Sequence, residues 1–446
     1  MRDLTLTLVF AALLGCMFKH PVIGAYLWAW FSLMNPHKMT YGFAFSLPFA
    51  QIIALITLVA LLFTRQRRAL PLNGITLLWL ALVVWMGVTS VFALNDPAVV
   101  FDRWLFVFKI HLMLLASLML IVNIQQFKLL VVIVTLSVAF FGIKGGVFTL
   151  ATGGGYIVWG PPGGMLGGNN EAAVGFVTLV PFLFWMRHIA TRPWLKRGLT
   201  LSIVLMVFAI LGSQSRGALL AIFAMGLFLG LKSNHPFRVM LLMMVGLALA
   251  VAFMPETWTA RMDTIGTYQE DSSAMSRLWT WTTLWNAAVD RPLVGAGYRA
   301  DSIAVFQRYA PVGGKWAAFE SLSSVWVAHS IYFQMLGEHG FVGLGLYLAL
   351  WLTAWLKAGR LARQAELIPS LSAWLPMLMR MTQVGLIGFA VGGAFLSLAY
   401  LDLPFYFMGY VILAQVLVSS VPVDVAARPS TSRQGRPVQS GAGSGS

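Results

Sequence analysis

The sequence predicts an all-α polytopic membrane protein that crosses the bilayer about twelve times. Of its 446 residues, 59% are hydrophobic and only 10% are charged, and the mean hydropathy is +0.80. A soluble domain carries about 25% charged residues. The apolar residues form continuous runs of roughly 15–25 residues, as transmembrane helices require, and not the ~10-residue alternating segments of an outer-membrane barrel.

Thirteen apolar runs define the expected spans, and the first two are short enough to count together as one crossing. The first run lacks a basic n-region and a small-residue cleavage site, so we expect it to be retained. The runs are Leu4–Phe18, Val22–Met34, Leu47–Phe63, Ile75–Ala93, Trp104–Ile124, Leu129–Leu150, Ala172–Met186, Leu199–Leu211, Ala218–Leu231, Val239–Met254, Ile331–Leu356, Met381–Leu398 and Phe405–Ser420.

These runs divide the chain into four regions. Residues 1–254 form an N-terminal transmembrane region and residues 331–421 hold the C-terminal transmembrane helices. Between them, residues 255–330 form a large loop that is rich in aromatic residues and carries six cations. Residues 422–446 are rich in Ser, Gly, Pro and Arg, which predicts a disordered cytoplasmic tail, and the last six resemble an expression-vector remnant.

The net charge of +15 sets the topology and does not indicate a nucleic-acid partner. Basic residues gather in short loops around positions 65–68, 187–197, 232–238 and 357–363, which places these loops in the cytoplasm. Residues 152–170, 213–215 and 255–330 then lie on the opposite side of the membrane. The single cysteine, Cys16, rules out a disulfide within the chain and a cysteine-based metal site.

Several cations are expected on that opposite side. Arg216 ends a polar turn between two apolar runs, and its guanidinium either pairs with phosphate or snorkels to the lipid headgroups. Lys109 and Lys144 lie within or at the rim of spans, close to the level of Arg103. An intramembrane lysine suggests a functional site, although pairing with Asp102 or Asp96 is an alternative. Together these cations suggest an anionic ligand at the outer leaflet.

Two further segments are candidates for substrate contact. The Gly-rich stretch 153–170 ends in Asn169 and Asn170, and its glycines let backbone amides approach a ligand, or else form a flexible re-entrant loop. The aromatic residues of the loop 255–330 either stack on sugar rings or form an interfacial belt. Residues 278–289 have apolar positions at helical spacing, so we expect an amphipathic helix that lies in the membrane plane.

His329 stands where the loop 255–330 meets the next span. Histidine is the side chain best suited to accept a proton near neutral pH, and its place next to the loop makes His329 a candidate general base. We interpret His339, ten residues later, as structural, and Glu338 as a candidate for substrate binding that helps to orient a partner. The histidines and carboxylates lack the HExxH spacing of zinc enzymes, so no metal is expected.

Two local patterns resemble the O-antigen ligase family of bacterial inner-membrane glycosyltransferases. Residues 216–220, Arg-Gly-Ala-Leu-Leu, match an Arg-x-x-x-Leu motif. His329-Ser330, followed after nine residues by Gly340-Phe-Val-Gly343, matches His-[Asn/Ser/Gln]-x9-Gly-x-x-Gly. Residues 32–38 and 144–150 also resemble the O-glycosylation ligase branch of this superfamily. The resemblance implies a GT-C-like scaffold of about twelve spans with one large periplasmic loop.

The resemblance also implies a reaction. The donor is a glycan on undecaprenyl pyrophosphate, the acceptor is a sugar hydroxyl of lipid A–core, and transfer inverts the anomeric carbon at the periplasmic face without a metal or a cofactor. Arg216 and His329 carry the family motifs, and Arg261 is the best match for a further phosphate-binding arginine. Arg277, in the same loop, is an additional candidate for substrate binding.

We therefore hypothesise a one-step displacement in which His329 is the general base and arginines hold the pyrophosphate. An O-antigen polymerase or a protein O-oligosaccharyltransferase of the same superfamily is an alternative, with a different acceptor. A lipid-linked glycan flippase or anion transporter is an alternative from another class. The absence of a clear inverted repeat in the sequence counts against a transporter.

Overall fold

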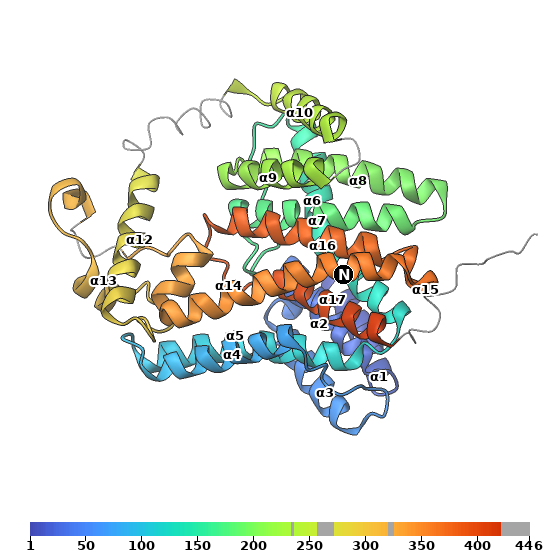
Figure 1. Ribbon diagram of the computed structural model, residues 1–446, viewed down its shortest axis with the longest axis horizontal. Helices are drawn as coiled ribbons and strands as arrows, with labels where there is room; N and C mark the ends of the chain where they lie inside the picture. The colour runs from blue at the N-terminus through green and yellow to red at the C-terminus, as the bar shows by residue number, and fades with distance from the viewer. Residues whose placement is uncertain (233–235, 257–271, 320–324, 421–446) are drawn as a thin grey trace, which may run out of the picture.

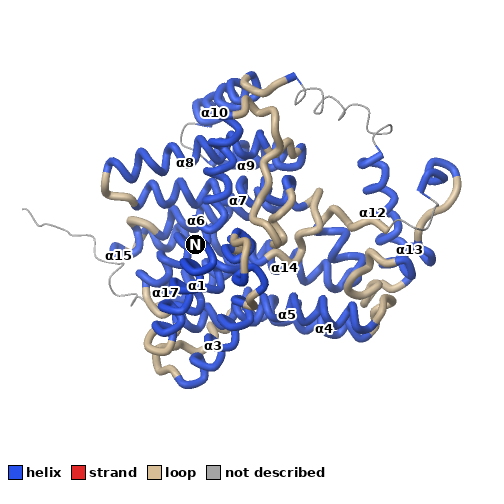
Figure 2. Tube along the Cα trace, turned by 180° about the vertical axis from the view of Figure 1, so that it is seen from behind, coloured by secondary structure: helices blue, strands red, loops and turns tan. Residues whose placement is uncertain are grey.

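The computed structural model of the chain describes residues 1–446 except 233–235, 257–271, 320–324 and 421–446. Every regular element in the described part is a helix, and Figure 2 shows helices joined by loops without a strand. Eight of the described helices are long and apolar enough to cross a membrane, and three shorter apolar helices accompany them. The predicted all-α polytopic class is therefore confirmed, while the expected disordered tail lies outside the described residues.

The helices of the N-terminal half occupy the predicted apolar runs, and polar caps start several of them early. Asp96 accepts hydrogen bonds from the backbone N–H groups of Ala98 and Val99, so its helix begins seven residues before Trp104. These helices are α1 (Arg2–Met17), α2 (Val22–Met34), η1 (Pro36–Met39), η2 (Phe43–Ser46), α3 (Phe49–Phe63), α4 (Gly74–Val91), α5 (Pro97–Leu120), α6 (Ile124–Ala151), α7 (Asn169–Ile189), α8 (Pro193–Gly212), α9 (Arg216–Lys232) and α10 (Pro236–Ala252).

The loop 255–330 is itself partly helical, and the C-terminal helices follow it. The expected amphipathic helix over residues 278–289 is part of a longer helix, α12, which begins six residues earlier. The elements of this half are α12 (Ser272–Asp290), α13 (Ile303–Tyr309), η3 (Gly314–Phe319), α14 (Ile331–Glu366), α15 (Pro369–Ser372), α16 (Leu375–Gly393) and α17 (Asp402–Ser419).

The core of the bundle is formed by α7 and α17, of which 78% and 72% of the spanning windows are buried. α7 packs against α6, α8, α9 and α16, while α17 packs against α5, α14 and α16. Small residues allow close approach: a Cβ on Gly146 of α6 would lie 2.0 Å from the Leu205 carbonyl oxygen of α8. Figure 1 shows α12 running crosswise to α14 and α4, beside one end of the long helices, with α13 next to it.

α14 is broken at Gly340, where φ is +69°. The break lets residues 292–299 dock on the helix: the N–H of Ala296 donates to the Gly337 carbonyl at 2.7 Å, and the N–H of Phe341 donates to the Pro292 carbonyl at 2.8 Å. A Cβ on Gly340 would lie 2.4 Å from the Leu293 carbonyl oxygen. Close backbone contact therefore explains the first glycine of the Gly-x-x-Gly motif.

Substitution of this glycine is expected to destabilise the protein. Gly340→Ala combines a left-handed backbone with a backbone clash, which costs roughly 2–4 kcal/mol. The matched control is Gly345→Ala, because Gly345 lies in the same helix with no atom within 4 Å of a built Cβ. We expect the thermal midpoint in detergent to fall for Gly340→Ala and to stay level or rise slightly for Gly345→Ala. Equal midpoints for the two variants would contradict this account of the break.

The predicted span Met381–Leu398 is wrong at its end. The apolar run Met381–Leu398 suggested a helix to Leu398, but α16 ends at Gly393. The N–H groups of Ala394, Phe395 and Leu396 donate to carbonyls only three residues back, which tightens the last turn and ends the helix. Residues 394–401 consequently leave the helix and carry polar side chains into the site described below.

Candidate functional site

The candidate site is built by chain segments that meet at one end of the helix bundle. His329, at the start of α14, donates its backbone N–H to the Ser397 hydroxyl at 2.8 Å. Asn169, the first residue of α7, donates its side-chain amide to the Ser213 carbonyl at 2.9 Å. The N–H of Leu94, after α4, donates to the Ala296 carbonyl at 2.8 Å. The tertiary fold thus joins segments that are more than 200 residues apart in sequence.

His329 is held in a left-handed backbone conformation with φ of 43°, which is uncommon for a residue with a side chain. The preceding residue is anchored by Trp281 of α12, whose indole N–H donates to the Ala328 carbonyl at 2.6 Å. Trp281 also stacks on Phe333, with 5.0 Å between ring centroids. Strained conformations of this kind are retained at functional sites, where the surrounding contacts fix them.

Burial and the charge of Arg277 lower the pKa of the half-buried His329 imidazole to about 4. The ring is therefore unprotonated at neutral pH and has a nitrogen lone pair that can accept a proton. Arg277 belongs to α12 and is itself half-buried. It also lies near Glu171 in the first turn of α7, on which its charge acts. The charge of Arg277, on α12, thus acts on groups at the start of both α14 and α7.

Arg216 begins α9 directly after a polar turn. The Ser215 hydroxyl accepts a hydrogen bond from the N–H of Ala218 and so caps the helix. The turn is tied to the Gly-rich stretch by the N–H of Val158, which donates to the Gly212 carbonyl at 2.9 Å, and to α7 through Asn169. The turn before Arg216 and the start of α7 beside Arg277 are therefore neighbours. Backbone N–H groups and guanidinium groups are suited to hold phosphate oxygens.

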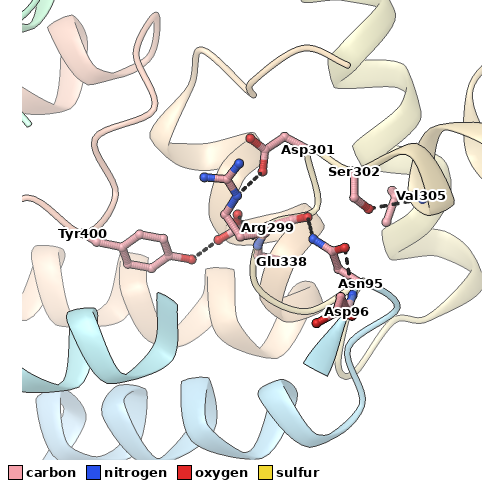
Figure 3. Close-up of polar contacts among 8 residues, drawn as sticks. All are labelled: Asn95, Asp96, Arg299, Asp301, Ser302, Val305, Glu338 and Tyr400. Carbon is pink, nitrogen blue, oxygen red and sulfur yellow. Dashed lines mark hydrogen bonds and ion pairs between the residues drawn. The ribbon is translucent and has the colours of Figure 1, made fainter. Parts of the chain in front are cut away.

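A pocket of about 170 Å³ is lined by residues 326–328, which precede His329, and by Ser397, which accepts the hydrogen bond from the His329 N–H. Its lining includes two arginines and two carboxyl groups. Arg299, whose backbone φ is 60°, pairs with Asp301 at 3.2 Å (Figure 3). Asp301 is mostly buried, and burial raises its pKa while the charges of Arg299 and Arg103 oppose this rise. The lining residues are Arg103, Leu284, Arg299, Ala300, Asp301, Trp326, Val327, Ala328, Gln334, Glu338 and Ser397.

A buried polar network fixes Glu338 at the wall of this pocket. The Tyr400 hydroxyl donates to one carboxyl oxygen of Glu338, and the Arg299 N–H donates to the other at 3.2 Å (Figure 3). His339, which is fully buried, lies 2.7 Å from the Tyr400 hydroxyl and 2.6 Å from the Thr89 hydroxyl. Because Tyr400 uses its hydrogen for Glu338, the Nε2–H of His339 donates to the Tyr400 hydroxyl. The structural interpretation of His339 agrees with these contacts.

Of the other predicted residues, some lie at the site and others do not. Arg103 lines the pocket, and its guanidinium lies 5.4 Å from the centroid of the Tyr400 ring. Asn170 is half-buried beside Asn169 at the start of α7. Lys109 and Lys144 have exposed side chains on α5 and α6 and do not line the pocket, so their role in substrate binding stays a prediction. Arg261 lies outside the described residues.

The sequence analysis did not predict five residues of this site. Four of them line the pocket, Arg299, Asp301, Gln334 and Ser397, and the fifth is the adjoining Tyr400. Arg299 and Asp301 stand among many other polar residues of the loop 255–330, so nothing in the sequence singles them out. Ser397 and Tyr400 fall in or beside a run that was interpreted as a helix. The polar residues of Ser-Leu-Ala-Tyr-Leu-Asp at 397–402, followed by Pro404, were a signal that this helix ends early.

Among the described residues, no three His, Cys, Asp or Glu side chains gather where they could hold a metal ion.

Comparison with known families places these features in context. Residues 1–191 match the model of a family of unknown function (DUF5935). Residues 201–348 match the model of the O-Antigen ligase family, over a stretch that includes Arg216, Arg277, His329 and Gly343. No curated protein matches the chain. Over residues 201–348 of an all-helical membrane scaffold, the chain is therefore similar to the O-antigen ligase family, in agreement with the resemblance of its two motifs.

Proposed function

We propose that the protein is an O-antigen ligase that transfers a glycan from undecaprenyl pyrophosphate to a sugar hydroxyl of lipid A–core. The proposal places the protein in the bacterial inner membrane with its site at the periplasmic face. The observation that carries it is the position of an unprotonated His329 beside Arg277, with the turn before Arg216 joined to the same end of α7. A base next to fixed cations suits displacement of an anionic leaving group.

In the proposed step, His329 accepts the proton of the acceptor hydroxyl as the oxygen attacks the anomeric carbon of the donor. The bond from that carbon to the pyrophosphate oxygen breaks on the opposite face, so the configuration inverts. Negative charge develops on the departing undecaprenyl pyrophosphate, where Arg277, Arg216 and Arg261 supply guanidinium groups. Fixed cations stabilise this charge at the moment of transfer, because they need no reorganisation.

Two alternatives keep the same donor chemistry but change the acceptor. An O-antigen polymerase would extend another lipid-linked glycan, and a protein O-oligosaccharyltransferase would glycosylate a Ser or Thr side chain. A flippase or transporter, in contrast, would move the lipid-linked glycan without cleaving its pyrophosphate bond. The match to the O-Antigen ligase family supports the transferases. The site supports them as well, because a flippase has no need of a base next to the phosphate cations.

The test is a transfer assay with the purified full chain in detergent. The mixture contains an undecaprenyl-pyrophosphate-linked glycan and lipid A–core, and mass spectrometry follows the products. We expect glycosylated lipid A–core and free undecaprenyl pyrophosphate in equal amounts. Parallel reactions with a second lipid-linked glycan or with a Ser/Thr-rich protein as acceptor identify a polymerase or a protein transferase. Intact donor in every reaction would contradict the proposed function and favour a flippase.

A further inference from the structure

We infer that the pocket lined by Arg103, Arg299, Asp301, Gln334 and Glu338 binds a sugar ring of the acceptor. The inference rests on the proposed glycan transfer and assigns the second substrate of that reaction to a separate set of residues. The pocket shares Ser397 with His329 and contains Ala328, the residue before His329. Its lining includes neither Arg216 nor Arg277. A ring bound there would lie next to the proposed base but apart from the proposed pyrophosphate cations.

The charges of the pocket favour an uncharged, hydroxyl-rich ligand over a diphosphate. Asp301 pairs with Arg299, which removes one cation from use by a phosphate, and Glu338 faces the same space. Carboxyl oxygens accept hydrogen bonds from sugar hydroxyl groups, and guanidinium groups donate to them. A phosphate oxygen, in contrast, is repelled by a neighbouring carboxylate. The combination of paired opposite charges with the amide of Gln334 is thus suited to recognise a sugar.

The network behind Glu338 fixes the carboxyl group in one orientation. The Tyr400 hydroxyl lies between His339 and Glu338 and donates to the Glu338 carboxyl group, so the two contacts of this hydroxyl depend on each other. Each Glu338 oxygen accepts one protein hydrogen bond and retains a lone pair for a ligand. The Tyr298 hydroxyl, buried near Glu338 and Arg103, has no partner among the described residues.

Trp326 supplies an aromatic face at the edge of the pocket. Its side chain is 40% exposed, although it stands only three residues before His329. A sugar ring that contacts the indole face would direct its hydroxyl groups toward the carboxyl and guanidinium groups behind it. The space of about 170 Å³ is enough for one ring. The pocket therefore binds the sugar ring that carries the reacting hydroxyl, while the rest of the acceptor lies outside the pocket.

The experiment varies donor and acceptor concentrations separately in the detergent transfer assay. For Glu338→Gln we expect the KM for lipid A–core to rise about 10-fold or more, as for loss of a hydrogen bond to a charged group. For Trp326→Ala we also expect this KM to rise, because the sugar ring loses its contact with the indole face. The KM for the lipid-linked donor is expected to change less than about twofold. Trp326→Phe, which retains an aromatic face, should restore most of the acceptor affinity. Arg308→Gln is the control, because Arg308 is an exposed residue of the same loop.

The outcomes separate this inference from the proposed function. If the wild-type protein forms no glycosylated lipid A–core, the proposed function fails and the inference falls with it. If the wild-type protein forms product and the variants raise the donor KM, the pocket belongs to the donor and only the inference fails. An unchanged acceptor KM in both variants would also contradict the inference and leave the proposed function intact. If Glu338→Gln does not fold, the Trp326 variants decide alone, because Trp326 lies in an exposed loop.

Discussion

Replacement of His329 by alanine is expected to lower kcat for glycan transfer about 10²–10⁴-fold, the range typical for loss of a general base. The imidazole lies where the loop 255–330 enters α14, and its backbone is fixed by Ser397. Without it, the acceptor hydroxyl must lose its proton to water as the glycosidic bond forms. Binding of both substrates should change little, so KM values are expected to stay within a few-fold of wild type.

The pH dependence of glycan transfer should reflect the protonation of the same residue, His329. The pKa of His329 lies at about 4 in the free protein, below its ordinary value of 6.5, because of burial and Arg277. A base acts only when unprotonated, so kcat/KM should fall only as the pH drops toward 4 and not near 6.5. A bound pyrophosphate next to Arg277 would offset its charge and raise the pKa of His329. The fall of kcat at low pH, the acid limb of its pH profile, should therefore lie at higher pH than the acid limb of kcat/KM.

Two comparisons make the His329 result specific. His20→Ala removes an exposed histidine outside the site and should leave turnover unchanged. Added imidazole should restore part of the turnover of His329→Ala, because the missing group is a small base. Full turnover by His329→Ala, or an acid limb that is the same in this variant and in wild type, would exclude His329 as the base.

Arg277→Gln is expected to lower kcat about 10²–10³-fold, because it removes a cation from the developing charge of the leaving group. Its second effect is electrostatic. Arg277 is one of the two causes that lower the pKa of His329, so its loss should raise that pKa toward 6.5 while burial still opposes the rise. The acid limb of kcat/KM should consequently move to higher pH.

Arg277→Lys separates charge from geometry. Lysine keeps a positive charge near His329 but lacks the planar fork that binds two phosphate oxygens at once. We expect its acid limb to stay close to that of the wild type and its kcat to lie between those of the wild type and Arg277→Gln. If Arg277→Gln changes neither kcat nor the acid limb, Arg277 is not a phosphate cation, and its position near Glu171 has only a structural role.

The sequence was sufficient for the scaffold because hydropathy in a bilayer is a local property. Each apolar run satisfies its own backbone hydrogen bonds as a helix, whatever its neighbours are. The run Val22–Met34, for example, is reproduced residue for residue by α2. The motif residues His329 and Gly340 were also identified, since their spacing is fixed along the chain. The predicted helix ends were less accurate where a capping residue or a tight last turn sets the end of the helix. Asp96 is such a cap at α5, and α16 has such a last turn.

The composition of the site depended on contacts that sequence spacing does not encode. Ser397 and Tyr400 reach His329 and Glu338 only because α16 stops at Gly393 and the chain folds back toward α14. Lys109 and Lys144, which the rule about intramembrane cations singled out, have exposed side chains that do not line the pocket. A helix position gives the depth of a residue, but which way its side chain faces depends on helix packing.

By itself, the sequence determined that this protein is a helical membrane protein and that Arg216 and His329 lie in motifs that resemble those of the O-antigen ligase family, because hydropathy and motif spacing are properties of the chain alone. Only the tertiary structure decided that Arg277 lies beside His329, and that Arg103, Arg299, Asp301 and Glu338 share one pocket. These residues come from α5, the loop 255–330 and α14, and their distances are set by the packing of helices that are remote in sequence.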